Sequence, residues 1–211
     1  MTGPLDTQVP FDAVLCDIDN VIRFYDDSGL LALERAAGLA EGTTAKVAFA
    51  PEVDLPLMLG RITPQEWVES IVTELTGLVP ARTARALAST LLALPFRADE
   101  AVVSLLRRAR TRVPLVLVSN ATVDLEDDLA RLGLTDLADD VVSSARVGLA
   151  KPDARIYELA AARAGVRPDR CLFVDDSTEN VEAATALGMR GAHFREPADL
   201  ERALAPLLGG A

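Results

Sequence analysis

The chain has 211 residues, of which 50% are hydrophobic, and its formal net charge at pH 7 is -11. This length suffices for one sizeable core and a small subdomain. The acidic balance argues against a nucleic acid or an anionic membrane as the main partner. It leaves room for a small anionic substrate, because local cations and a metal can reverse the field inside a cleft.

Residues 1–6 contain neither a basic segment nor a long apolar one, so we expect no signal peptide, and no apolar run approaches the length of a membrane span. Cys16 and Cys171 each lie in an apolar run, which favours two buried thiols over a disulfide. Free thiols are typical of a reducing compartment, so we expect a cytoplasmic protein.

The first predicted strand covers residues 13–19 and ends in two carboxylates, Asp17 and Asp19. The residues before Asp17 form a continuous apolar run, as in strands that are buried on both faces of a parallel sheet. An unpaired carboxylate buried at such a place costs several kcal/mol or has a raised pKa. Asp17 therefore needs a compensating partner.

Residues 24–96 depart from this strand pattern. We expect a small all-helical cap, inserted after the first strand, because helical patterns fill the interval and no convincing strand is found. In the clearest helix, Thr63 and Glu66 form a capping box and Pro64 suits the first turn. The recognisable helices cover residues 30–40, 63–77 and 80–94.

After the cap, apolar runs rich in β-branched residues alternate with helical patterns, and Pro152 suits the first turn of one of these helices. The alternation predicts an α/β core domain, residues 1–23 and 97–211, with a Rossmann-like, mostly parallel sheet flanked by helices. The later strands are expected at residues 114–120, 140–144, 171–177 and 191–194.

Polar residues lie where the predicted strands end, which is where open α/β sheets bind their ligands. Taken singly, each has a bland explanation: Ser119 or Asn120 could cap the next helix, and Asp176 with Glu179 resembles a capping box. Lys151 lies just before a helix, where its positive charge interacts unfavourably with the helix dipole. This placement is explained if an anion binds there. The residues at these ends are Asp17, Asp19, Ser119, Asn120, Lys151, Asp175 and Asp176.

Taken together, these residues would bring several carboxylates to one sheet edge, where they would repel one another. A divalent cation would remove this repulsion, and oxygen ligands of this kind suit Mg²⁺, which commonly takes one or two carboxylates and a phosphate oxygen. Lys151 and the Ser119 hydroxyl would then face the remaining phosphate oxygens. Such a site fits phosphoryl transfer through an aspartyl-phosphate.

The motifs D-I-D-N, S-N, K-P-D and D-D-S-T-E-N, in this order and at these intervals, resemble the haloacid dehalogenase superfamily of phosphohydrolases. They span most of the chain, and the helical interval resembles the small cap of that family. The resemblance implies that Asp17 is the nucleophile that becomes the aspartyl-phosphate. It implies that Asp19 is the general acid and then the general base, with its main-chain carbonyl on the metal.

The same resemblance implies that Ser119 and Lys151 are catalytic groups that hold phosphoryl oxygens, with Lys151 also stabilising the nucleophile. We place Asn120 with them in the substrate-binding set. Asp175 is implied as the main metal carboxylate, and Asp176 lies beside it, on the metal directly or through water. The expected Mg²⁺ site thus comprises Asp17, Asp19, Asp175 and Asp176.

Two residues depart from the pattern of the family. Asn20 stands where Gly is usual, and Val21 stands where Thr is frequent. Asn tolerates left-handed backbone angles better than most residues, so the turn can survive, and neither change removes a catalytic group. In the last motif, Asn180 is expected to be a supporting residue.

We therefore expect a Mg²⁺-dependent phosphohydrolase of a small phosphorylated metabolite, present as a monomer or a homodimer. A sugar phosphomutase would keep the same residues, and a non-catalytic binding or regulatory protein could use the same scaffold. Dehalogenation is disfavoured, because dehalogenases of this family replace the second Asp and need no metal, whereas Asp19, Asp175 and Asp176 are all present. The cap sequence does not choose among sugar phosphates, phosphoglycolate-like acids and nucleotides.

Four other features are weaker candidates for function. His193, the only histidine, is expected to be a packed or surface residue, and Trp67 is expected to pack in the cap core. Residues 23–25 lead from the first motif toward the cap and are candidates for substrate contact. Arg61 in the cap is a still weaker candidate.

Overall fold

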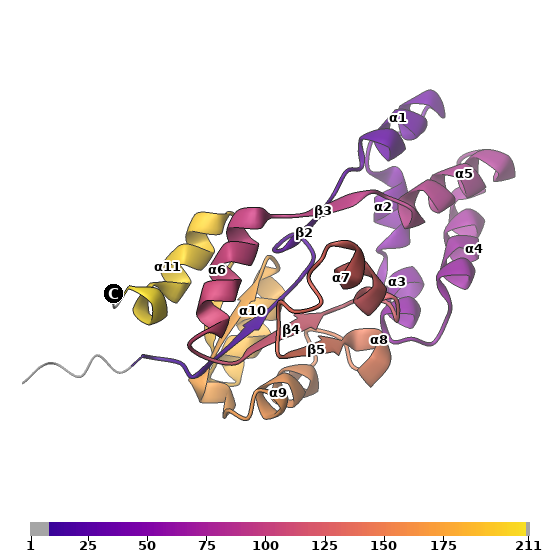
Figure 1. The fold of residues 1–211 in the computed structure, drawn as a ribbon. Coiled ribbons are helices and arrows are strands. Elements are labelled where there is room, and N and C mark those ends of the chain that lie inside the picture. Colours follow the sequence, from indigo (N-terminus) through magenta and orange to yellow (C-terminus); the bar gives the residue numbers. More distant parts are fainter. Residues whose placement is uncertain (1–8, 210–211) are drawn as a thin grey trace, which may run out of the picture.

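A five-stranded parallel sheet forms the centre of the core domain (Figure 1). The computed structural model describes residues 9–209, so the expectation for residues 1–6 lies outside the described part. All five predicted strands are present, as β1 (Ala13–Cys16), β4 (Leu115–Ser119), β5 (Asp140–Ser143), β6 (Cys171–Asp175) and β7 (Arg190–His193). Their order is β5-β4-β1-β6-β7, and each neighbouring pair is parallel. The first strand of the chain therefore lies in the middle of the sheet.

Helices cover both faces of this sheet. The side chains of β1 alternate between two buried clusters: Val14 and Cys16 belong to one, and Leu15 belongs to the other. The first cluster includes residues of α6 (Glu100–Arg110), α7 (Leu125–Arg131) and α11 (Pro197–Leu208), and the second includes residues of α9 (Ala154–Arg163) and α10 (Thr178–Ala186). Burial on both sides explains why the strand sequence is apolar throughout.

The cap is helical, as predicted, and has a hydrophobic core of its own, in which Ile71, Leu75 and Leu87 are fully buried. The capping box is confirmed: the backbone N–H of Glu66 donates to Thr63 Oγ1 over 3.2 Å, and that of Thr63 donates to the Glu66 carboxylate over 2.7 Å. The cap helices are α1 (Ser28–Ala36), α2 (Thr43–Ala48), α3 (Pro51–Met58), α4 (Pro64–Leu75) and α5 (Ala81–Leu92).

The two ends of the cap segment form a short antiparallel ribbon of β2 (Arg23–Tyr25) and β3 (Phe96–Ala98), which joins the cap to the core (Figure 1). The expectation that residues 24–96 contain no strand is therefore wrong at both ends. Strands of three residues are too short to show alternation, and their partners are far apart in the sequence. The predicted domain boundaries, at residues 23/24 and 96/97, fall within this ribbon.

The expectation that Pro152 lies in the first turn of a helix is wrong, and the alternative capping roles of the strand-end residues are not found, because other residues cap these helices. The N-cap of α7 is Asp124, well beyond Ser119 and Asn120. The N-cap of α9 is Asp153, so Pro152 precedes the helix. The N-cap of α10 is Ser177, whose hydroxyl accepts the backbone N–H of Asn180, so Asp176 and Glu179 form no capping box. The strand-end residues are thereby left for other contacts.

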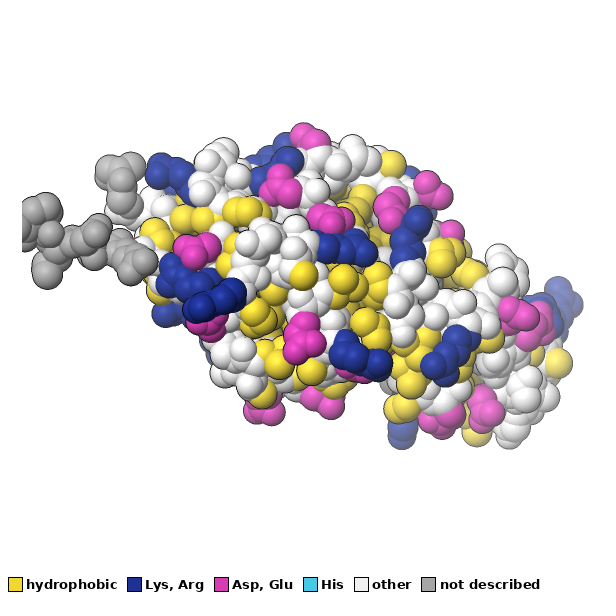
Figure 2. Space-filling model, turned by 90° about the horizontal axis from the view of Figure 1, so that it is seen from below, with side chains coloured by type: hydrophobic (Ala, Val, Ile, Leu, Met, Phe, Trp, Pro, Cys, Tyr) yellow, Lys and Arg dark blue, Asp and Glu magenta, His cyan; other side chains and the backbone are white. Residues whose placement is uncertain are grey.

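On the face shown in Figure 2, basic and acidic side chains are interspersed. Exposed ion pairs such as Arg85–Glu69 and Arg107–Asp136 connect neighbouring elements, and each contributes little to the free energy of unfolding in water. The two cysteines are free and buried, as expected. Among residues 9–209, no helix combines the length and the apolar character that crossing a bilayer requires.

Candidate active site

The site is built at the carboxyl ends of three neighbouring strands. Asp17 directly follows β1, Ser119 ends β4 and Asp175 ends β6, and β1 lies between the other two strands. Lys151 comes from the loop that follows β5 and the short helix α8 (Ser144–Val147). Since all these strands are parallel, their ends meet at one edge of the sheet, where ligands of such folds bind.

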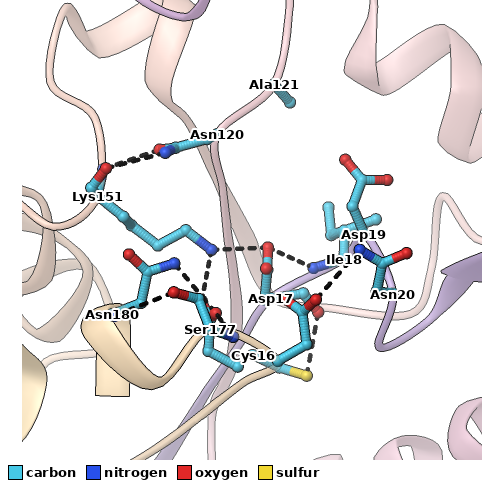
Figure 3. A network of polar contacts seen from close by, with 12 residues as sticks. Cys16, Asp17, Ile18, Asp19, Asn20, Asn120, Ala121, Lys151, Ser177 and Asn180 are labelled. Atoms are coloured by element: carbon cyan, nitrogen blue, oxygen red, sulfur yellow. Dashed lines mark hydrogen bonds and ion pairs between the residues drawn. The ribbon is translucent and has the colours of Figure 1, made fainter. Parts of the chain in front are cut away.

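Lys151 is the buried cation of this site. Its ammonium Nζ lies 2.7 Å from Asp17 Oδ1 and 2.7 Å from Asp175 Oδ2, and its side chain is 1% exposed (Figure 3). Burial by itself would lower the pKa of Lys151, but the two carboxylates outweigh it and raise this pKa above its usual range. The structure thus joins three of the predicted site residues in one contact network.

In this network, Lys151 does not fully balance the negative charge of the buried Asp17 carboxylate. Its Oδ1 also accepts the backbone N–H of Ile18 over 2.7 Å. Burial nevertheless raises the pKa of Asp17 to about 7, with Lys151 opposing this shift and the Asp175 charge adding to it. One ammonium therefore does not balance the buried carboxylates around it, so further positive charge would be favourable here.

Asp175 is fully buried, and both of its carboxylate oxygens accept hydrogen bonds. Oδ2 accepts from Lys151, while Oδ1 accepts the backbone N–H of Ser177 over 2.8 Å and the side-chain amide of Asn180 over 3.0 Å. Asn180 is thus placed as a supporting residue, as expected from its motif. The Tyr157 hydroxyl in turn donates to the Asn180 carbonyl over 3.1 Å.

Asp17, Asp175 and Asp176 can each offer an oxygen to a common point, since these three atoms lie within 4.8 Å of one another. Asp176 is more open than the other two. Its Oδ2 accepts the side-chain amide of Asn20 over 3.1 Å, and burial raises its pKa while the Asn20 contact lowers it. A set of carboxylate oxygens with too little positive charge is the donor set that suits Mg²⁺. The residues present therefore fit this metal.

The Asp19 side chain lies apart from this cluster and points away from Lys151 in Figure 3. Its carboxylate is held by Arg23 through two hydrogen bonds, of 2.6 Å to Nε and 2.9 Å to Nη2. Arg23 Nη1 donates to Asp128 of α7 over 2.7 Å. The four-residue spacing of Asp19 and Arg23 was a weak signal for this pair, whereas nothing in the sequence indicated Asp128.

The other predicted residues are placed as follows. Ser119 is 1% exposed and pairs in register with a serine of β5. The side-chain amide of Asn120 donates to the Lys151 carbonyl over 2.9 Å and accepts the Lys151 N–H over 2.8 Å, so Asn120 holds the lysine loop. His193 is exposed, with Nε2 2.9 Å from the Asp176 carbonyl oxygen, and Trp67 is buried in the cap core, both as predicted. Arg61 is exposed.

Comparison with known proteins gives a family for this geometry. A family model described as haloacid dehalogenase-like hydrolase matches residues 11–188. The chain is 39% identical over 84 residues to a phosphatase of Mycobacterium tuberculosis, and this alignment covers 40% of this chain and 39% of the relative. It is 33% identical over 150 residues to the pyrimidine 5'-nucleotidase YjjG of Escherichia coli, and this alignment covers 67% of this chain and 63% of the relative. The matches thus span less than two thirds of these relatives.

A similar fold is found in a solved structure. A haloacid dehalogenase family enzyme of Bacteroides thetaiotaomicron, in complex with magnesium and inorganic phosphate, superposes with a TM-score of 0.67. The sequences are 20% identical, and the match covers 88% of this chain and 94% of that one. At this identity the likeness shows a shared fold.

Proposed function

Since the chain belongs to the haloacid dehalogenase-like hydrolases, we propose that it is a Mg²⁺-dependent phosphatase of a small phosphorylated metabolite. The observation that carries this proposal is the buried Lys151, whose ammonium contacts Asp17 and Asp175 at once. A buried carboxylate with an adjacent cation and two further carboxylates is suited to attack phosphorus beside a metal.

The reaction begins with Asp17. One of its carboxylate oxygens attacks phosphorus, an aspartyl-phosphate bond forms, and the bond from phosphorus to the leaving oxygen breaks with its electron pair on that oxygen. Asp19 gives the leaving oxygen a proton when the leaving group needs one. Lys151 orients the Asp17 carboxylate and offsets charge on the phosphoryl group, and the Ser119 hydroxyl binds a phosphoryl oxygen.

Hydrolysis then regenerates the enzyme. A water molecule attacks phosphorus of the aspartyl-phosphate while the Asp19 carboxylate accepts its proton, and the bond between phosphorus and the Asp17 oxygen breaks. Inorganic phosphate and the free Asp17 carboxylate result. Asn120 holds Lys151 in place through both steps, by its two hydrogen bonds to the backbone of that residue.

Asp17, Asp175 and Asp176 would hold Mg²⁺ together with the Asp19 carbonyl. When bound, the ion supplies positive charge that reduces the repulsion between these carboxylates and the phosphoryl group. Asp176 is more exposed than Asp175 and makes fewer hydrogen bonds with its carboxylate, so it is the more accessible of the two to an entering ion. The magnesium and phosphate in the Bacteroides enzyme support such a site.

The relatives named as a phosphatase and a 5'-nucleotidase support hydrolysis over the alternatives. A phosphomutase would not release phosphate and alcohol in equal amounts. A regulatory protein would show no turnover, and a dehalogenase would release halide without a metal. Measuring phosphate and alcohol together separates these cases.

The first prediction concerns Asp17. With para-nitrophenyl phosphate, the wild type should show Mg²⁺-dependent turnover that EDTA removes, and Asp17→Asn should lower kcat by roughly 10³-fold or more, because the nucleophile is lost. Asp12→Asn is the matched control: Asp12 precedes the same strand, is exposed and pairs with Arg170 at the opposite end of the sheet. Its activity should equal that of the wild type. A wild type without metal-dependent turnover would sink the phosphatase proposal.

A further inference from the structure

Arg23 is a charged side chain that the proposed reaction does not yet use. It begins β2 at the edge of the site and is 4% exposed. The sequence made it a candidate for substrate contact. In the structure, each of its three guanidinium nitrogens donates to a carboxylate of this chain, on Asp19 or on Asp128. A substrate could reach the guanidinium nitrogens only if these partly buried contacts opened.

The contact with Asp19 is bidentate, with Nε on Oδ1 and Nη2 on Oδ2. A planar fork of this kind fixes both oxygens of a carboxylate and hence the rotamer of the side chain. The backbone adds to this constraint, since the N–H of Arg23 donates to the Ile18 carbonyl over 2.8 Å and the Arg23 carbonyl accepts the N–H of Asn20 over 2.9 Å. Residues 18–23 therefore form a loop that is closed by both backbone and side-chain hydrogen bonds.

The other side of the guanidinium is anchored in the core and in the ribbon. Nη1 reaches Asp128 of α7, and the guanidinium carbon lies 5.2 Å from the ring centre of Tyr25 and 5.4 Å from that of Phe96. These contacts tie Asp19 to α7 and to both strands that carry the cap. Through Arg23, the Asp19 carboxylate is thus restrained by contacts with the core and with the ribbon.

We propose that Arg23 is a positioning residue: its bidentate contact fixes the rotamer of Asp19, the residue that accepts the proton of the water that hydrolyses the aspartyl-phosphate. The inference rests on the proposed function and assigns Arg23 to its second half. The water O–H bond breaks as its proton moves to Asp19, the new oxygen–phosphorus bond forms, and the bond from phosphorus to Asp17 breaks. Arg23 acts through Asp19 and does not touch the substrate.

Para-nitrophenyl phosphate isolates this role, because nitrophenolate departs without a proton and the first step needs little help from Asp19. Arg23→Gln should leave the first turnover fast and lower steady-state kcat by roughly 10- to 100-fold, the usual cost of a displaced catalytic group. Nitrophenol should then appear in a burst, and acid-quenched enzyme should carry phosphate on Asp17 by mass spectrometry. KM should not rise. Arg23→Lys, which keeps the charge but not the fork, should be intermediate.

Arg131→Gln is the matched control. Arg131 also contacts Asp128, over 3.2 Å, and lies 4.7 Å from the Phe96 ring centre, but it is 68% exposed and forms no hydrogen bond or ion pair with Asp19. It should show no burst and no loss of kcat. Asp19→Asn should reproduce the burst, and adding Arg23→Gln to it should cost nothing further, since both changes remove the same group from the second step.

Several results would overturn the inference. A raised KM at unchanged kcat would make Arg23 a substrate contact, and equal slowing of the burst and of the steady state would give it no role in the second step. Thermal unfolding checks that the variants fold. If Arg23→Gln does not fold, the kinetics of Arg23→Lys test the inference instead. An active wild type with an unaffected Arg23→Gln sinks this inference alone. A wild type without Mg²⁺-dependent turnover sinks the proposed function first.

Discussion

At the scale of single residues, Asn20 combines two functions that the sequence did not connect. Within residues 9–209 it is the one non-glycine residue with a positive φ, of 59°, so it makes the turn after the first motif as Gly would. Its side-chain amide also donates to Asp176, which lies 156 positions further along the chain. The departure from the usual Gly thus adds a contact to the carboxylate that we expect on the metal.

We predict that Asn20→Gly weakens Mg²⁺ binding by roughly 10-fold while the turn survives. Gly accepts the positive φ but cannot orient Asp176, and loss of such an outer contact typically costs 10- to 100-fold in metal affinity. Calorimetric titration with Mg²⁺ measures the affinity without turnover. Equal thermal unfolding of both proteins in EDTA would show that the turn is intact, and equal Mg²⁺ affinities would contradict the prediction.

At the scale of elements, the cap helix α3 contains a carboxylate whose burial destabilises the folded cap. Val53 and Leu57 bury one face of this helix in the cap core. Asp54 lies beside them, its Oδ1 is buried with no hydrogen-bond partner in the described part of the chain, and burial raises its pKa to about 6. Burying a carboxylate oxygen without a hydrogen-bond partner costs free energy in the folded state at neutral pH.

We predict that Asp54→Asn raises the free energy of unfolding at pH 7 by about 1 kcal/mol, a value discounted for partial exposure. The folded-state pKa of about 6 lies above the unfolded-state value, so Asp54 favours the protonated folded state. The penalty is complete above about pH 7, falls as the pH drops from about 6 to about 4, and vanishes near pH 3, below the unfolded-state pKa. Urea unfolding at about pH 7 and about pH 3 should therefore show a gain only at the higher pH. Glu52→Gln, exposed on the same helix, should show no such gain.

At the scale of the whole molecule, the main contacts between the cap and the core lie at two places. One is the ribbon of β2 and β3, and the other is the contact of α3 and the loop after it with α8 (Figure 1). Gly60 lies in that loop with φ +66°, and a Cβ on it would lie 2.5 Å from the Ala145 carbonyl oxygen. The second contact is therefore a close backbone approach that only Gly permits.

We predict that Gly60→Ala destabilises the protein more than Gly38→Ala does. Gly38 is also in the cap and has φ +74°, but a Cβ there would meet nothing within 4 Å, so its replacement costs only backbone strain of about 1–2 kcal/mol. Gly60→Ala adds the clash with Ala145, which should lift the loop from α8 and speed amide exchange in both segments. Equal unfolding free energies for the two variants would show that the close approach contributes nothing.

The sequence alone predicted the α/β fold, the five strands and the gathering of Asp17, Lys151 and Asp175. These features depend on local information: apolar runs long enough to be recognised, and polar residues directly at their ends. Parallel pairing then leaves little freedom, because ends that share an edge must be close. The helical nature of the cap followed from local patterns too, with the capping box of Thr63 as its clearest sign.

Only the tertiary structure decided the features that join distant segments. The ribbon pairs residues more than 70 positions apart, and its strands are too short to be seen alone. The contacts of Arg23 with Asp128 and of Asn20 with Asp176 are side-chain contacts between separate elements, as is the hold of Asn120 on the Lys151 loop. The sequence thus determined which groups reach the sheet edge. The fold decided how each is held there, because hydrogen-bond geometry depends on atoms that local patterns do not place.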